Sequence, residues 1–311
     1  MKYLVVLLTL ALAGSVSAAH EKIAVIPKGT THLYWKSVEA GARQAGRELG
    51  VEILWKGPLT EDDRAQQIAV VEQFVSAGVS GIVLAPLDDT ALRGPVRTAR
   101  ERHIPVVIFD SALKGEAGKD FVSFVATNNH RGGELAANEL VRRLGGKGKI
   151  VLLRYQEGSA STAAREAGFL EVIKQHPEMK MIVENRYAGA TTSSAQDAAM
   201  NLIDKVREAD GIFCSNESCT QGMLLALRQT GLAGSKTFIG FDASPLLLAA
   251  LKKGELQGLV AQNPTRMGYL AVTTLVKHLR GEKVPEAIDT GCLLVTQANR
   301  STPEVKAVLG Q

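Results

Sequence analysis

The sequence predicts an α/β protein of two lobes, each built on a doubly wound parallel sheet. Short apolar segments alternate with amphipathic helical segments about every 25 to 30 residues, the pattern of parallel strands covered by helices on both faces. The candidate strands number ten, more than one sheet ordinarily holds, so two lobes of about five strands each are expected. One candidate strand in each half ends on an aspartate.

The strands are predicted from apolar runs that are too short for helices and are bounded by turn-forming residues. In chain order they are Ile23–Ile26, Val51–Trp55, Gly81–Leu84, Val106–Phe109, Val122–Val125, Ile150–Leu153, Met181–Asn185, Gly211–Cys214, Phe238–Phe241 and Gly258–Ala261. Between them, apolar residues three and four positions apart predict helices. The clearest helices are Leu33–Leu49, Ala65–Ala77 and Glu134–Leu144, with C-cap glycines expected at Gly50, Gly78 and Gly145.

The composition is that of an ordinary globular protein, with 311 residues, 45% of them hydrophobic and 22% charged, and a formal net charge of +4. No run of Lys and Arg exceeds two residues, so no nucleic-acid partner is expected. Cys214, Cys219 and Cys292 are expected to be buried small side chains, although a disulfide between the first two stays open. There is no CxxC or HExxH motif, so no metal site is expected.

The N-terminus has the pattern of a secretory signal peptide. Lys2 gives a positive start, Tyr3–Ala13 is apolar, and small residues lead up to Ala18. Residues 1–18 are therefore predicted to be cleaved from a soluble, exported protein; an uncleaved N-terminal anchor is the alternative. No later segment approaches the ~20 apolar residues of a membrane helix.

Asp110 and Asp242 directly follow two of the predicted strands. A buried carboxylate is costly unless a partner compensates for the water that it loses. In open α/β sheets, ligands bind at the carboxyl ends of the strands. The two acids, one in each half, therefore predict a ligand held between two lobes.

The loop after the first strand carries Lys28 and the adjacent aromatic residues Tyr34 and Trp35, in a chain with only 5% aromatics. A sugar needs a flat apolar surface against its C–H face and polar groups around its rim. Adjacent residues cannot share one helix face, so we expect these rings to supply that surface. The alternative is one ring in the core and one on the surface.

Three further polar residues follow strands in the second half. Arg165 lies near the start of an apolar-faced helix, where a cation is unfavourable by ~0.3–1 kcal/mol, so one or both aspartates are expected to pair with it. Its alternative role is that of an exposed helix arginine. Asn216 and Gln262 each offer a donor and an acceptor, which suits ligand hydroxyls, although either could instead cap the following helix.

Enzyme classes find little support in the sequence. There is no GxSxG, GxxxxGK[ST] or HExxH motif, no GxGxxG motif follows the first strand, and no cofactor is expected. Asp110 and Asp242 could be imagined as the acid and base of a glycosidase, but pairing with Arg165 would keep both ionised.

Four motifs in a fixed order resemble a known family. They are TAAREAGF (162–169), FCSNESCTQGML (213–224), IGFDASP (239–245) and VAQNPTRMG (260–268). Together they make the whole mature chain resemble the periplasmic sugar-binding proteins of ABC importers, in the ribose-binding branch, with the type I periplasmic binding protein fold.

This resemblance implies two lobes joined by three crossover strands, near 126–127, 261–262 and 291–293. The N-terminal lobe would comprise 20–126 and 263–291, and the C-terminal lobe 127–262 and 292–311. The ligand-binding residues implied are Tyr34, Trp35, Asp110, Arg165, Asn216, Asp242 and Gln262, with Lys28 added by its similarity to a lysine in relatives that bind rhamnose or a furanosyl quorum signal.

Two positions depart from the family pattern. Ser111 stands where an arginine is common, and Gly189 stands where the second lobe commonly carries an aromatic residue, so that only Tyr187 could replace that ring. The pocket is therefore expected to differ from a ribose site.

The predicted function is non-enzymatic: a monomer binds a monosaccharide or polyol in the periplasm and delivers it to a membrane permease. The alternatives are a sensor that presents its ligand to a chemoreceptor or histidine kinase, and the binding of another small polar ligand such as a furanosyl quorum signal. A transcriptional repressor with the same core is disfavoured by the export signal and by the lack of room for a DNA-binding domain before Ile23.

Overall fold

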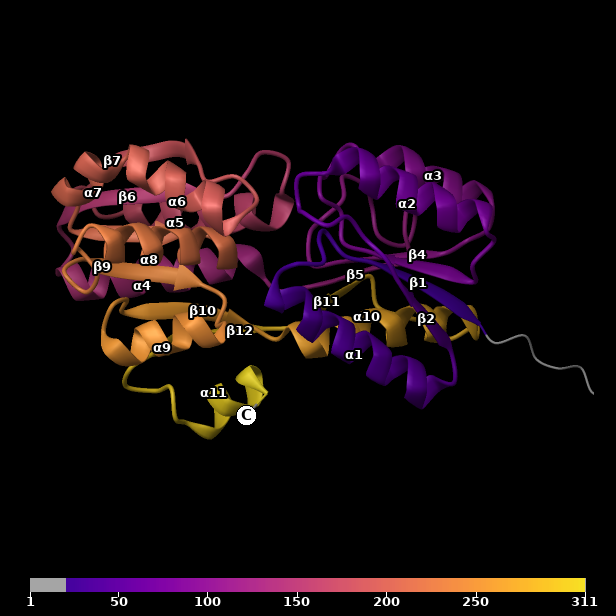
Figure 1. The fold of residues 1–311 in the computed structure, drawn as a ribbon. Coiled ribbons are helices and arrows are strands. Elements are labelled where there is room, and N and C mark those ends of the chain that lie inside the picture. The colour runs from indigo at the N-terminus through magenta and orange to yellow at the C-terminus, as the bar shows by residue number, and fades with distance from the viewer. Residues whose placement is uncertain (1–20, 311) are drawn as a thin grey trace, which may run out of the picture.

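The computed structural model describes residues 21–310 and divides them into two α/β lobes that lie side by side (Figure 1). Each lobe contains one sheet of six strands. The expectation of two α/β lobes is therefore confirmed. The predicted signal peptide, residues 1–18, lies outside the described residues. No helix within 21–310 is long and apolar enough to cross a membrane.

The sheet of the first lobe is parallel throughout, in the order β11-β5-β4-β3-β1-β2. Its strands are β1 (Lys22–Ile26), β2 (Glu52–Trp55), β3 (Gly81–Leu84), β4 (Val106–Phe109), β5 (Ser123–Ala126) and β11 (Ala287–Asp289).

The sheet of the second lobe has the equivalent order β12-β10-β9-β8-β6-β7. Its strands are β6 (Gly148–Arg154), β7 (Met179–Tyr187), β8 (Gly211–Cys214), β9 (Thr237–Phe241), β10 (Gly258–Gln262) and β12 (Cys292–Thr296). The edge strand β12 is antiparallel to β10, whereas a wholly parallel sheet was expected. The strand β11 escaped prediction because it has only three residues and is partly exposed, whereas β12 does contain an apolar run, residues 292–295, that the sequence reasoning left out of its strands.

Helices cover both faces of both sheets. In the first lobe they are α1 (Leu33–Leu49), α2 (Arg64–Ser76), α3 (Arg93–Glu101) and α10 (Pro264–Leu279). In the second lobe they are α4 (Asn129–Leu144), α5 (Ala160–Lys174), α6 (Thr192–Asn201), α7 (Ile203–Glu208), α8 (Glu217–Gln229), α9 (Pro245–Lys253) and α11 (Pro303–Leu309). Gly50 and Gly145 are left-handed C-caps as predicted, whereas the C-cap of α2 is Ala77, one residue before Gly78.

Each central strand contributes side chains to two hydrophobic cores, one on each face of the sheet, because successive side chains point to opposite faces. In β1, Ile23 and Val25 pack with α1 and α10, whereas Ala24 and Ile26 pack with α2 and α3. This two-sided burial explains why the strands read as continuous apolar runs.

Glycines allow the closest helix pairs to meet. A Cβ atom on Gly133 of α4 would overlap the carbonyl group of Arg165 in α5, and one on Gly41 of α1 would overlap the carbonyl of Thr265 in α10. The two helix pairs occupy equivalent places in the two lobes. The α4–α5 contact also fixes the backbone of Arg165.

The chain passes between the two sheets at three places. It leaves the first sheet after β5, returns after β10 and crosses again between β11 and β12. Side chains at the three crossings meet: the Thr127 hydroxyl donates to Gln262 Oε1 over 2.8 Å and lies 3.4 Å from the hydroxyl of Thr290. All three residues are buried. The crossings are thus tied together beside the space between the lobes.

Candidate functional site

All eight residues proposed from the sequence line one cavity between the lobes, with a volume of about 30 Å³. They follow the carboxyl ends of β1, β4, β8, β9 and β10, except Arg165, which lies on α5 after β6. The full lining consists of Lys28, His32, Tyr34, Trp35, Glu61, Asp110, Tyr155, Ser161, Thr162, Arg165, Asn216, Glu217, Asp242 and Gln262.

Asp110 and Asp242 occupy equivalent positions and share an unusual backbone conformation. Their φ angles are +61° and +69°, in the left-handed region that non-glycine residues seldom adopt. The amide of each donates to the next strand of its sheet, to Val125 O over 3.0 Å and to Val260 O over 2.8 Å. Such strain costs on the order of 1–3 kcal/mol per residue. Both of these strained residues place a carboxylate at the cavity.

The carboxylate of Asp110 is fully engaged by groups of the protein. Lys28 Nζ lies 3.2 Å from Oδ2, and the Tyr34 hydroxyl donates to Oδ1 over 2.8 Å. Lys28 also donates to the hydroxyls of Ser161 over 2.9 Å and Ser159 over 3.3 Å, both in the second lobe. Lys28 therefore joins the two lobes at the floor of the cavity.

Asp242 is bound less completely. Gln262 Nε2 donates to its Oδ1 over 2.8 Å, which connects the carboxylate to the crossing segments through Thr127. Burial raises the pKa of Asp242, and the charge of Asp110 adds to that, whereas Arg165 and Gln262 oppose it. No residue within 21–310 forms an ion pair with Asp242 inside 4.0 Å.

Arg165 does not pair with either aspartate, so that expectation is wrong. Its Nε donates to Asn129 Oδ1 over 2.8 Å, its Nη1 donates to the Ser215 carbonyl over 2.9 Å, and its guanidinium carbon lies 3.8 Å from the centre of the Phe241 ring. The side chain is buried, not exposed. These contacts hold the guanidinium at the cavity wall, where its charge still acts on Asp242.

Asn216 performs the capping role that was its alternative assignment. Its Oδ1 accepts from the amide of Cys219 over 3.1 Å, which caps α8, and its Nδ2 donates to the Ser218 hydroxyl over 3.0 Å. It nevertheless faces the cavity. The neighbouring thiols of Cys214 and Cys219 are free and buried, so the disulfide left open by the sequence is not formed.

The two adjacent aromatic residues begin α1 and lie at right angles. The Tyr34 and Trp35 ring centres are 5.0 Å apart with an interplanar angle of 85°. Trp35 is 2% exposed and also contacts Phe109 edge-on, so it belongs to the core as well as to the cavity wall. Tyr187 is 42% exposed and does not line the cavity. The second lobe contributes Tyr155 instead.

Glu61, His32 and Tyr155 form a cluster that the sequence reasoning missed. Glu61 Oε1 accepts from Trp35 Nε1 over 2.7 Å and lies 2.9 Å from His32 Nδ1, and its Oε2 accepts from the Tyr155 hydroxyl of the other lobe over 2.8 Å. Burial alone would raise the pKa of Glu61, but His32 and the charge of Lys28 outweigh it and hold the pKa at about 2.

Glu217 makes a second contact between the lobes. Its Oε2 accepts from the amide of Tyr34 over 3.3 Å, and its Oε1 accepts from Gln221 over 3.0 Å. Burial and the charge of Asp242 raise the pKa of Glu217 to about 7, against the opposing effect of His32. Glu61 lies in the loop after β2, and Glu217 directly follows Asn216 after β8. Both lie near the carboxyl ends of strands, where ligands bind in open α/β sheets, so the sequence could have indicated them.

Backbone contacts close the rim of the cavity. Gln156 Nε2 donates to the Glu61 carbonyl over 2.7 Å, and the amide of Ser161 donates to the Ser111 hydroxyl over 3.1 Å. Ser111, where an arginine was noted as common, thus serves as an acceptor between the lobes. The loop before α5 is therefore docked on the first lobe.

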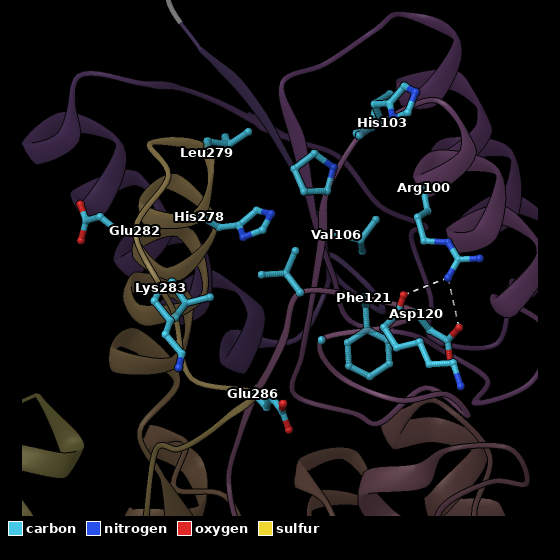
Figure 2. Close-up of a pocket in the computed structure, with 16 residues that line it drawn as sticks. Arg100, His103, Val106, Asp120, Phe121, His278, Leu279, Glu282, Lys283 and Glu286 are labelled. Atoms are coloured by element: carbon cyan, nitrogen blue, oxygen red, sulfur yellow. Dashed lines mark hydrogen bonds and ion pairs between the residues drawn. The ribbon is translucent and has the colours of Figure 1, made fainter.

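Larger hollows are also present, and one of them, of about 580 Å³, adjoins this cavity and shares Tyr34, Glu217, Asp242 and Gln262 with it. A cleft of about 680 Å³ lies at the amino ends of β4 and β5 and beside the end of α10 (Figure 2). Its most prominent cation, Arg100, already binds Asp120 and the Lys119 carbonyl. The side chains do not converge on one point, and the cleft is on the wrong edge of the sheet for ligand binding. We therefore take the cavity between the lobes as the site.

Comparison with known proteins gives consistent matches over nearly the full length. A family model described as a periplasmic binding protein domain matches residues 23–283. A curated relative, the ribose import binding protein of Haemophilus influenzae, is 28% identical over 293 residues, which cover 94% of this chain and 97% of the relative.

Solved structures are similar at higher identity. A carbohydrate transporter solute-binding protein from Agrobacterium radiobacter, in complex with D-arabinose, is 35% identical with a TM-score of 0.89, covering 94% of this chain and 99% of that one. An ABC transporter solute-binding protein from Agrobacterium vitis, with bound D-fucose, is 37% identical with a TM-score of 0.88, covering 92% and 98%.

Proposed function

This chain belongs to the periplasmic binding protein family, and we propose that it is the sugar-binding component of an ABC importer. In this role it captures a monosaccharide or polyol between its lobes and delivers it to a membrane permease, without chemical change. We place the N-terminal lobe at 20–126 with 263–291 and the C-terminal lobe at 127–262 with 292–311. We further propose that the protein acts as a monomer in the periplasm after cleavage of residues 1–18.

The observation that carries this proposal is the convergence of eight polar or aromatic side chains from both lobes on one buried cavity. Carboxylates, a guanidinium and amides together accept from and donate to hydroxyl groups, each of which is both donor and acceptor. We assign direct ligand contacts to Arg165, Asn216, Asp242 and Gln262, and the apolar wall to Tyr34 and Trp35. Asp110 and Lys28 complete the floor.

Ligand entry requires movement of the lobes. The cavity of about 30 Å³ is far smaller than the several hundred Å³ of an ordinary small-molecule pocket, and direct bonds between the lobes surround it. We infer a hinge at the three crossing segments, with Gln262 linking Asp242 to that hinge. A ligand that binds both lobes then favours closure through its differential affinity for the closed state.

A thermal-shift screen tests the proposal. The mature protein is mixed with pentoses, hexoses, deoxysugars, polyols and sugar acids, and hits are measured by calorimetry. A ligand at 100 times its dissociation constant adds ~2.7 kcal/mol to the free energy of unfolding, which corresponds to roughly 5 °C or more in melting temperature for a protein of this size. A panel with no stabilising sugar or polyol would contradict the assignment.

Two other roles remain distinct from transport. The same liganded form could be read by a chemoreceptor or a histidine kinase, and the ligand could be another small polar molecule such as a furanosyl quorum signal. Pull-down with the partner permease, compared with pull-down with the sensor domains, distinguishes transport from sensing. The thermal-shift screen itself distinguishes a sugar or polyol from another small polar ligand.

A further inference from the structure

Lys28 has no hydrogen-bond donor left for a ligand. An ammonium group carries three protons, and three protein acceptors surround Nζ: Asp110 Oδ2 at 3.2 Å, Ser161 Oγ at 2.9 Å and Ser159 Oγ at 3.3 Å. The residue is 3% exposed, although its side chain is long and charged. Two of the three acceptors belong to the second lobe, so this arrangement is completed only when the lobes are together.

Lys28 is also a part of the cavity wall that can be truncated by mutation without loss of core contacts. Among the lining residues with long side chains, Arg165 is stacked on Phe241 and bound to Asn129, and Trp35 and Tyr155 are packed in the protein. Truncation of any of these would take away core contacts. Truncation of Lys28 would instead remove three methylene groups and an ammonium that protrude into the space between the lobes.

We propose that Lys28 limits the size of the ligand, so that the site selects pentoses and short polyols over hexoses. This inference rests on the proposed sugar-binding function and names the substrate class. In this proposal Lys28 acts as a fixed wall, held at its tip from both lobes, and the exocyclic hydroxymethyl group of a hexose pyranose is the group that meets it. Asp242, Arg165, Asn216 and Gln262, which line the same cavity, then bind the hydroxyls of the ring.

Matched sugar pairs test the size limit by isothermal titration calorimetry. D-ribose and D-allose, D-xylose and D-glucose, L-arabinose and D-galactose, and D-lyxose and D-mannose each differ only by the hydroxymethyl group of the pyranose. We expect the native protein to bind the pentose of its best pair at least ~10-fold more tightly, the scale on which a pocket discriminates small apolar additions. We expect Lys28→Ala to reduce that ratio by ~10-fold or more.

Two further variants separate volume from charge and from folding. Lys28→Met keeps most of the length of the side chain and loses its charge, so it should weaken the binding of both sugars of a pair while leaving their affinity ratio within about twofold of the native value. The double variant Lys28→Ala with Asp110→Asn removes the buried charge that Lys28→Ala alone would leave unpaired, and asparagine tolerates the left-handed backbone at 110. It should show the same relaxed ratio as the single variant.

The outcomes distinguish this inference from the function on which it rests. Tighter binding of the hexose by the native protein, an unchanged ratio in both alanine variants, or an equal change in Lys28→Met would overturn the size limit while sugar binding stands. Failure of the native protein to bind any sugar of the four pairs would overturn both.

Discussion

The hydrogen bond between Tyr155 and Glu61 joins the two lobes, so removing it measures how much a contact between protein groups stabilises the closed state of the lobes. The two residues lie in different lobes, and the Tyr155 hydroxyl donates to Glu61 Oε2 over 2.8 Å. We expect Tyr155→Phe, which removes only the hydroxyl, to weaken ligand binding by at least about tenfold.

The magnitude follows from the surroundings of Glu61. A hydrogen bond to a charged group contributes ~1.5–3 kcal/mol. In the variant Glu61 Oε1 keeps His32 at 2.9 Å and Trp35 at 2.7 Å, whereas Oε2 loses its hydrogen bond, so ~1.5 kcal/mol is the smallest loss that we expect. In a separated state both groups would be hydrated, so the loss falls on the closed state alone. About 1.5 kcal/mol corresponds to about a tenfold change in the dissociation constant.

The assay is isothermal titration calorimetry with each ligand that the native protein binds. Tyr269→Phe is the matched control, because its hydroxyl also donates to a glutamate, Glu48, over 2.7 Å, but on the surface of a single lobe. We expect Tyr155→Phe to weaken all ligands by the same factor, since the lost bond joins protein to protein, and Tyr269→Phe to leave them unchanged.

Three results would refute this reasoning. Affinity within twofold of the native value in Tyr155→Phe would show that the bond does not stabilise the closed state. A loss that differs strongly between ligands would instead make Tyr155 a ligand contact. Equal losses in both variants would point to a general effect of removing a tyrosine hydroxyl.

Three further predictions follow from other contacts. Asp242→Ala should cost at least ~2 kcal/mol of ligand affinity in calorimetry, because it removes a carboxylate that forms no ion pair inside 4.0 Å within 21–310; unchanged binding would contradict its place in the site. The pKa of Glu217 is raised from its usual value near 4.5 to about 7 in the closed state, so closure takes up a proton between pH 4.5 and 7. Ligand affinity should therefore fall as the pH rises through that window, by at most ~3 kcal/mol, and Glu217→Gln should flatten this dependence of affinity on pH. Gly133→Ala should destabilise the fold by ~1–3 kcal/mol in denaturant unfolding because its Cβ atom would overlap the Arg165 carbonyl, whereas Gly94→Ala, with open space around it, should not destabilise it; equal midpoints for these two variants would argue against the close packing of α4 on α5.

Local sequence patterns carried most of the fold. Buried strands such as Val106–Phe109 and Gly211–Cys214 were predicted to the residue because both of their faces are covered, which requires an unbroken apolar run. The edge strand β11 carries no such run, and the apolar run of β12 does not reveal its antiparallel pairing, which depends on where the third crossing brings the chain.

The site shows the same division. Residues directly after strands, such as Asp110, Asp242 and Gln262, could be placed at one sheet edge from the sequence, since parallel strands expose their carboxyl ends together. Their partners could not be assigned, because nothing local indicates that Lys28 rather than Arg165 meets Asp110, or that Arg165 rests on Phe241.

The sequence by itself determined the two α/β lobes, the carboxylate that ends a strand in each lobe, and eight of the residues that line one cavity. The tertiary structure alone decided which groups pair across that cavity. Tyr155 and Glu61 are 94 positions apart, and Lys28 and Ser161 are 133 apart. Such pairs are created by the docking of one lobe on the other, and the periodicity of a single strand or helix carries no information about that docking.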